Sequence, residues 1–370
     1  MKRFFAFFLI FFLFFPVFSQ KSWRLSLDGK TRIFTSEKDD FLWNGEQAGL
    51  FANGSGTVSI YKNGKKTAFI RAVFVFGAEE SDFVPLSDGS LYAGESKGSE
   101  KKLVPHGFGV LKKANGNVYA GVFRRGAFSG SGERFDSNGT LLYSGEFKNG
   151  RYNGNGKLFE DKKLVYSGIF KDGVRHGSGI ETVASSTFCG KWKNDKKDGA
   201  FEIKTGSVTR TVFYKDGIAD LQNAVVRYPN GIEWSGSVDS EMNPAGEGVL
   251  KYPSGDVYSG EVFENARNGF GHFVSADGFS YSGEWSDDVF EGSGEASFAF
   301  SDGTGWHYAG NWSGGEFDGF GELSSGHFSY SGEWKNGERL GNGTIFAAGA
   351  QYDGELKSDR LNGQGLFVFP

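Results

Sequence analysis

The sequence lacks the features that mark several common classes of protein. It has one cysteine, Cys189, in 370 residues, so no internal disulfide can form and the fold must hold without covalent crosslinks. The five histidines include no pair at HExxH spacing, and none of the Gly-x-Gly pairs leads into the Gly-Lys-Ser/Thr of a phosphate-binding loop. We therefore expect no catalytic residues, no cofactor and no metal.

Long hydrophobic runs are also missing, with one exception at the N-terminus. Lys2 and Arg3 precede an unbroken apolar run over residues 4–15, and a small-residue site ends at Ser19. This order predicts a secretory signal peptide over residues 1–19. As a helix the apolar segment would span only about 22 Å, less than the roughly 30 Å hydrocarbon core, which favours a cleaved signal over an uncleaved anchor. We expect an exported protein, periplasmic or extracellular.

A repeated pattern accounts for most of what is present. The 58 glycines and 39 phenylalanines exceed ordinary usage, and an aromatic residue recurs about every 22 to 27 residues. One longer interval, after Phe188, holds a degraded unit at residues 210–233. We predict about twelve units over residues 92–370, preceded by an N-terminal cap over residues 20–91 with a possible degenerate unit from Trp43. The aromatic residues that open the units are Tyr92, Tyr119, Tyr143, Tyr166, Phe188, Trp234, Tyr258, Tyr281, Tyr308, Tyr330 and Tyr352.

Each unit is too short for two helices and is interrupted by glycine every few residues, which favours a β-hairpin. In YSGEFKNGRYNGNGKLF, Tyr143, Gly145 and Phe147 share one face of a strand, and Asn149-Gly150 suits a tight turn. Glycine between two aromatics leaves room for a ring against the backbone. The pattern predicts a ladder of aromatic rings, either core or the lining of a groove. It comprises Tyr143, Phe147, Tyr166, Phe170, Trp192, Tyr281, Trp285, Tyr308, Trp312, Tyr330 and Trp334.

The units resemble the MORN (membrane occupation and recognition nexus) repeat, whose pattern is Tyr-x-Gly-x-Phe/Trp-x-x-Gly-x-x-x-Gly-x-Gly. The resemblance implies an all-β fold, an elongated repeat array of antiparallel β-hairpins that form a twisted meander sheet with an aromatic groove. It implies roles in scaffolding, membrane association or peptide binding, and no catalytic residues. The chain departs from the pattern where other residues replace the turn glycine, namely Asp195, Glu241, Asn265, Asp288 and Asp359.

Charge is distributed unevenly along the repeats. Residues 119–217 carry 17 Lys and Arg against 11 Asp and Glu, whereas residues 218–370 carry 7 against 23. In five successive units a basic residue directly follows the second aromatic position, and two strands per unit would space these side chains about 9.6 Å apart. This basic stripe could meet a repeating anionic surface. It could instead be a solvated Glu/Lys ladder, since Glu146 and Lys191 lie two residues before Lys148 and Lys193 on the same face. It consists of Arg124, Lys148, Lys171, Lys193 and Lys215.

Two functions from different classes remain open. The first is a scaffold that binds protein or peptide partners through the aromatic groove and strand edges. The second is adsorption to anionic lipid or glycan surfaces through the basic stripe. Sugar binding would need exposed rings at Trp285, Trp312 and Trp334, which we expect to be buried. Self-association through the terminal strand or the split charge is a further possibility, and no nucleic acid partner is expected.

Cleavage of the signal peptide after Ser19 would leave a mature chain that begins near Gln20. Mass spectrometry of the protein from its native host should find an N-terminal peptide starting near Gln20 in the periplasmic or extracellular fraction. A membrane-bound chain that keeps Met1 would instead demonstrate an uncleaved anchor.

Overall fold

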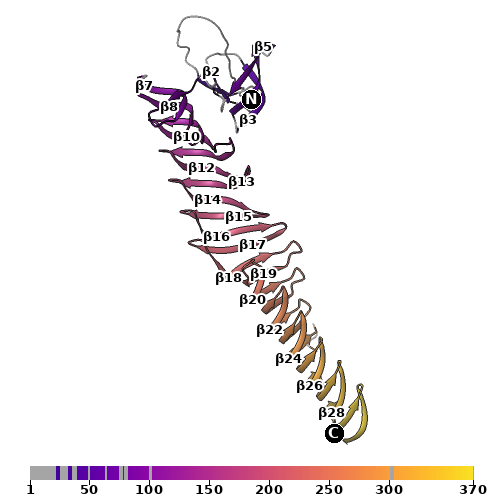
Figure 1. Ribbon diagram of the computed structural model, residues 1–370. Helices are drawn as coiled ribbons and strands as arrows, with labels where there is room; N and C mark the ends of the chain where they lie inside the picture. The colour runs from indigo at the N-terminus through magenta and orange to yellow at the C-terminus, as the bar shows by residue number, and fades with distance from the viewer. Residues whose placement is uncertain are drawn as a thin grey trace. The chain divides into compact units, whose positions relative to one another are not determined.

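The computed structural model shows an all-β protein (Figure 1). It describes residues 22–25, 32–35, 40–48, 51–62, 65–74, 78, 82–99, 102–300 and 304–369. Every regular element in this part of the chain is a β-strand, which confirms the predicted array of antiparallel hairpins. None of these residues forms a helix with the length and apolarity needed to cross a bilayer. The predicted signal peptide lies outside the described residues.

The chain divides into two compact units. The first contains the described residues up to Ala184 together with Cys189–Lys196, and the second contains Ser185–Phe188 and the described residues from Lys197 onward. Residues of both units occur in β15 (Ser186–Lys193) and β16 (Lys196–Thr205).

The other strands of the first unit are β1 (Ser22–Leu25), β2 (Arg32–Thr35), β3 (Asp40–Ala48), β4 (Phe51–Lys62), β5 (Lys65–Phe74), β6 (Val84–Pro85), β7 (Leu91–Ser99), β8 (Lys102–Lys112), β9 (Val118–Arg124), β10 (Ala127–Phe135), β11 (Leu141–Lys148), β12 (Arg151–Glu160), β13 (Lys163–Lys171) and β14 (Val174–Val183). The other strands of the second unit are β17 (Val208–Lys215), β18 (Ile218–Arg227), β19 (Glu233–Val238), β20 (Pro244–Lys251), β21 (Val257–Phe263), β22 (Ala266–Val274), β23 (Phe279–Ser286), β24 (Val289–Ala299), β25 (Gly305–Ser313), β26 (Glu316–Ser325), β27 (Phe328–Lys335), β28 (Glu338–Ala347), β29 (Ala350–Lys357) and β30 (Arg360–Val368).

A five-stranded sheet precedes the repeats. Its strands follow the order β1-β2-β4-β3, and β5 pairs with β4. In the hairpin β3–β4 Gly45 lies opposite Gly56, the same register that places Gly145 opposite Gly156 in the repeat of β11–β12. The backbone of the weak unit at Trp43 therefore matches that of a repeat.

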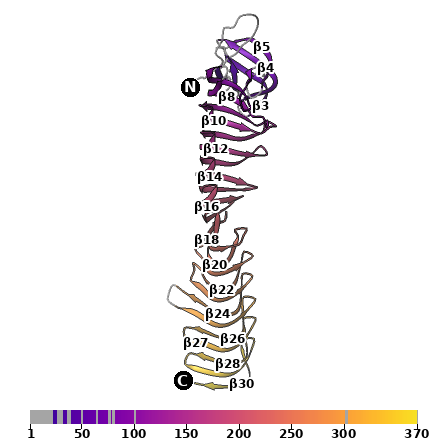
Figure 2. The same ribbon diagram turned by 60° about the vertical axis from the view of Figure 1, so that its left-hand side comes forward.

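Within each unit the repeat strands pair antiparallel with the next strand along the chain. In the first unit this holds from β6 to β14, and in the second from β16 to β30. Figures 1 and 2 show the successive hairpins side by side. Each predicted unit is one hairpin; the unit that opens at Tyr143, for example, is the hairpin β11–β12.

The hairpin turns depend on positive φ angles. Asn149 and Gly150 have φ of 51° and 80°, as a type I′ turn requires. Most replacements of the turn glycine keep this conformation, with φ between 65° and 68° at Asp195, Asn265, Asp288 and Asp359. In the unit of Glu241 the positive φ falls instead on Met242.

A tyrosine ring lies over a pair of glycines in each complete repeat. Gly145 and Gly156 are opposite each other in β11 and β12, and a Cβ added at Gly145 would lie 2.5 Å from the Gly156 Cα and 2.7 Å from the Tyr143 hydroxyl. The Tyr143 hydroxyl donates a hydrogen bond to the Glu146 carbonyl at 2.9 Å. The space left by the glycines is thus filled by the opening aromatic of the same hairpin.

Neighbouring hairpins join through further rings and one backbone bond. Tyr152 stacks on Tyr143 at 3.7 Å between centroids, and Phe170 of the next hairpin meets the same ring edge-on at 5.3 Å. The Gly173 N–H at the next turn donates to the Tyr152 carbonyl at 2.9 Å. The hairpin β11–β12 is therefore held to the next one by an aromatic contact and a hydrogen bond at the turn.

The degraded unit, β17–β18, keeps the hairpin without the tyrosine and glycines. Arg210 stands at the position of the opening aromatic and Val212 at that of the first glycine. Val212 is fully buried, and Phe201 and Val226 on the flanking strands are buried with it. The Arg210 Nε donates to the Met242 carbonyl at 2.8 Å. In this hairpin the buried side chain of Val212 takes the place that the tyrosine ring and glycine pair have in the complete repeats.

Replacing one glycine of a pair should be costly. In Gly332→Val the new Cβ would lie 2.7 Å from the Gly343 Cα and against the Tyr330 ring, and overpacking of this kind costs about 1 to 3 kcal/mol. Asn342→Val, on an exposed site of β28, adds the same side chain without that overlap. Denaturant unfolding should show destabilisation for Gly332→Val alone, and wild-type stability of Gly332→Val would refute the ring-on-glycine packing.

Candidate functional site: a groove on the aromatic face and a basic hairpin edge

The aromatic ladder predicted from the sequence forms the core of the repeats. Its eleven side chains are at most 6% exposed. The indole N–H groups of Trp285, Trp312 and Trp334 donate to backbone carbonyls at 3.1 to 3.2 Å. These indoles are buried, as expected, and offer no exposed platform to a sugar. Burial raises the pKa of Tyr308 to about 12, so its phenol stays neutral at pH 7.

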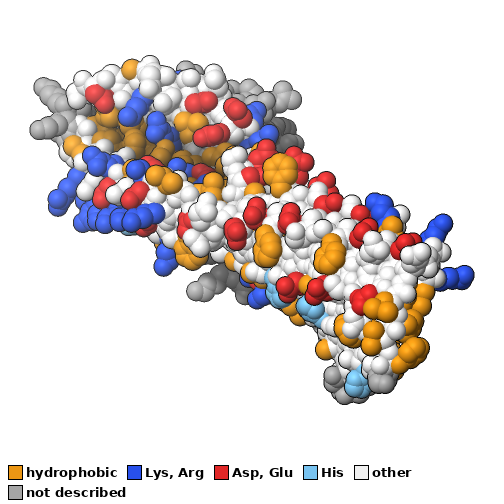
Figure 3. Space-filling model, turned by 90° about the horizontal axis from the view of Figure 1, so that it is seen from below, with side chains coloured by type: hydrophobic (Ala, Val, Ile, Leu, Met, Phe, Trp, Pro, Cys, Tyr) orange, Lys and Arg blue, Asp and Glu red, His pale blue; other side chains and the backbone are white. Residues whose placement is uncertain are grey.

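A groove lies on the aromatic face of the first unit. Its larger cavity has a volume of about 680 Å³ and its smaller one about 160 Å³, and the two share Tyr152. Leu158, Val165 and Tyr166 contribute to the apolar lining of the larger cavity, and Glu160 stands among its charged residues. Figure 3 shows a hollow with hydrophobic side chains at its floor and charged side chains along its sides.

Arg175 organises the charged side of the larger cavity. Its guanidinium lies 4.2 Å from the centroid of the Trp192 ring, 2.6 Å from a Glu181 oxygen and 3.1 Å from an Asp195 oxygen. The Arg175 amide also donates to the Asp195 carboxylate at 2.8 Å. Cation–π contact and two carboxylates therefore hold this arginine in one orientation.

The same kind of Arg–Asp ion pair accounts for three of the five positions where another residue replaces the turn glycine. Asp195, Asp288 and Asp359 each bind an arginine of the preceding hairpin, with N–O distances of 3.1, 2.7 and 2.7 Å. The corresponding position in other repeats holds a ring that stacks on the tyrosine, as Phe128 and Tyr152 do. We did not predict these pairs, although an arginine 20 or 21 residues before each of the three aspartates was a visible signal.

The basic stripe lies at hairpin turns. Arg124, Lys148 and Lys171 end β9, β11 and β13, and because alternate strands of an antiparallel sheet run the same way, these ends share one edge. Lys193 ends β15 in the same manner, and Lys215 ends β17 in the second unit. All five side chains are exposed.

No ion pair involves the stripe within the described residues. The Glu146 carboxylate accepts the Asn155 amide at 3.0 Å, so it is engaged by the backbone of the neighbouring strand. Within the described residues Glu146 and Lys148 form no ion pair. The described part of the chain also has no cluster of three or more His, Cys, Asp or Glu suited to a metal ion, and Cys189 is exposed and unpaired.

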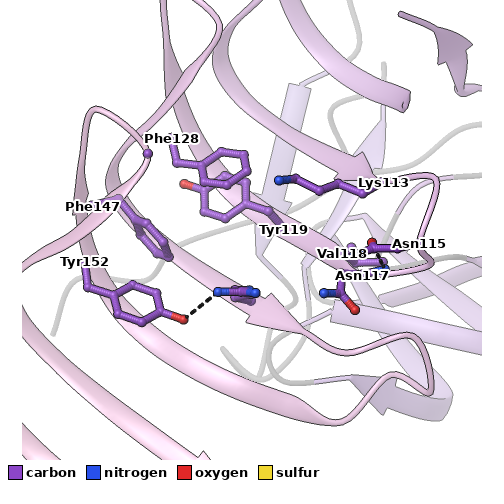
Figure 4. Close-up of a pocket in the computed structure, with 10 residues that line it drawn as sticks. Lys113, Asn115, Asn117, Val118, Tyr119, Phe128, Phe147 and Tyr152 are labelled. Atoms are coloured by element: carbon purple, nitrogen blue, oxygen red, sulfur yellow. Dashed lines mark hydrogen bonds between the residues drawn. The ribbon is translucent and has the colours of Figure 1, made fainter. Parts of the chain in front are cut away.

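The smaller cavity combines aromatic and cationic side chains (Figure 4). Tyr119, Phe128, Phe147 and Tyr152 line it, together with Lys113, Asn115, Asn117, Val118, Arg134 and Gly150. We did not predict it from the sequence, because its residues come from three hairpins.

Comparison with known proteins supports the repeat assignment. The family model for the MORN repeat matches residues 104–118, 119–141, 143–161, 166–186, 188–200, 243–257, 258–279, 281–299, 308–326, 330–350 and 352–370. Nine of these matches begin at an aromatic predicted to open a unit. A comparison with curated proteins found no match.

Proposed function

The chain belongs to the MORN repeat family, and from that premise we propose that it is a non-catalytic, exported scaffold that binds a protein or peptide partner in the groove of its first unit. MORN repeats are commonly protein- or membrane-binding modules, and proteins built from them are typically non-catalytic. The observation that carries the proposal is the groove, since the aromatic rings themselves are taken up by the core.

The groove suits an extended chain more than a compact ligand. Its two cavities adjoin at Tyr152, so one ligand can occupy both only if it extends along the aromatic face. The larger cavity falls in the range of about 300 to 1,000 Å³ usual for ligand sites. Its aromatic lining and fixed charged groups at Arg175, Glu181 and Asp195 provide an apolar contact with polar groups that set orientation.

A paired substitution on β14 tests the groove. Val183, 53% exposed, lines the larger cavity, whereas Ile180, 46% exposed, lies on the opposite face of the same strand. Peptides selected from a random display library on the wild-type chain should lose binding to Val183→Arg, because the long side chain fills the cavity. The same peptides should bind Ile180→Arg like the wild type. No selectable peptide, or equal loss in both variants, would overturn the proposal.

The basic edge supports a second candidate function, adsorption to anionic lipid or glycan surfaces. The supporting observation is that Arg124, Lys148, Lys171 and Lys193 are exposed along the turns of successive hairpins and form no ion pair with any other described residue. Each basic residue held near an anionic membrane contributes about 1 kcal/mol. Four in a row would therefore give a useful but salt-sensitive attraction.

Two triple Lys→Glu variants with the same net charge test whether vesicle binding depends on where the lysines lie. Changing Lys148, Lys171 and Lys193 to Glu should abolish sedimentation with anionic vesicles at low salt, with little change in melting temperature because all three side chains are exposed. A control triple variant changes Lys157, Lys162 and Lys163 to Glu, which are equally exposed but do not end the odd-numbered strands. The control should keep binding. Equal loss in both variants, or no wild-type binding, would remove the adsorption function.

A further inference from the structure

The smaller cavity of the groove has aromatic walls. Phe128 stacks on Tyr119 with centroids 3.8 Å apart, and Phe147 meets Phe128 edge-on at 5.9 Å. Tyr152 meets Phe147 edge-on at 5.4 Å, so the rings that line the cavity form a continuous set of contacts. Figure 4 shows these rings facing the cavity beside Lys113. Its volume of about 160 Å³ is close to the roughly 150 Å³ of an apolar cavity that holds benzene.

Arg134 stands at a position that most repeats fill with an apolar residue. It lies opposite Tyr119 in the hairpin β9–β10. The residues opposite the opening aromatic in other hairpins are Leu111, Leu158, Glu181, Leu250, Phe273, Ala296, Leu323, Ile345 and Phe367. Glu181 is the other charged residue of this set, and it is bound to Arg175.

The cavity has cationic groups and no acidic group. Arg134 Nη1 donates to the Tyr152 hydroxyl at 3.2 Å, and a dashed line ends at this hydroxyl in Figure 4. The Lys113 ammonium lies 5.9 Å from the Phe128 centroid. Neither residue has an ion pair within the described part of the chain, and no Asp or Glu lines the cavity. The Tyr152 hydroxyl accepts from Arg134, which leaves its own proton to donate to a ligand.

We propose that this cavity is an anchor pocket for an acidic side chain, Asp or Glu, of the peptide that occupies the groove. Arg134 and Lys113 supply the charge, Tyr152 supplies a hydroxyl, and the rings contact the methylene groups of the side chain. We assign the acidic side chain to a peptide because the larger cavity adjoins this one at Tyr152 and has room for the rest of an extended chain. The specificity for an acidic residue rests on the proposed function, while the pocket can be tested alone.

A matched pair of small probes tests the pocket. Benzoate and benzamide have similar shapes, but only benzoate is charged, so Arg134 and Lys113 should favour benzoate by about tenfold or more. An NMR titration of the wild-type chain should shift signals of Phe128 and Tyr152 with benzoate at lower concentration than with benzamide. Arg134→Gln should remove this preference, and Arg151→Gln, an exposed charge change on β12 outside the cavity, should keep it.

Peptide binding distinguishes the anchor from the groove. Library peptides that lose binding to Val183→Arg should share an acidic residue. Changing that residue to Gln should weaken binding to the wild-type chain about tenfold, but it should not weaken binding to the Arg134→Gln variant. Equal affinity for benzoate and benzamide, or a benzoate preference that Arg134→Gln leaves unchanged, would overturn the pocket. Groove-dependent peptides without an acidic requirement would overturn the anchor and leave the proposed function standing. A benzoate preference without groove-dependent peptides would remove the proposed function alone.

Discussion

The seating of an aromatic ring on two glycines is the contact on which the rest of the repeat depends. The Tyr143 ring occupies the space above Gly145 and Gly156, and any Cβ at either position would overlap it. Its hydroxyl is satisfied within the same strand, so burial leaves no unpaired polar group. Tyr152 of the same hairpin stacks on this ring, and Phe170 of the next hairpin contacts it edge-on, which positions that hairpin. Local steric fit in one hairpin thereby determines packing between hairpins.

Because the rings serve the core, the groove takes its character from the residues at which repeats differ. Replacing a stacked ring with Arg175 brings Asp195 to the next turn and Glu181 to the larger cavity. Arg134, at a position that is apolar in most repeats, instead gives the smaller cavity a positive charge. Two adjoining cavities of similar construction thus present different charges to a ligand. The residues that depart from the repeat pattern set the charge of the cavities, while the residues that follow the pattern stabilise the fold.

Much of the repeat could be predicted from the sequence because its determinants are local. The alternation of Tyr143, Gly145 and Phe147, followed by Asn149-Gly150, is sufficient to indicate a strand, a ring socket and a turn. The groove could not be predicted in this way. Lys113, Arg134 and Tyr152 belong to three hairpins, and their meeting depends on strand register and on bulges such as the one between Gly145 and Phe147. Such bulges increase the local twist, so their effect accumulates from strand to strand.

The sequence by itself determined the hairpin as the repeating element, the aromatic ladder on one strand face and the basic stripe after the second aromatic. Strand alternation and turn geometry act over a few residues, and these features are therefore written in each unit. Only the tertiary structure decided that the stripe is exposed at hairpin turns, that Asp195 forms an ion pair with Arg175, and that Arg134 faces Tyr152. These outcomes depend on which side chains of neighbouring hairpins meet, and pairing register, not residue type alone, decides such contacts.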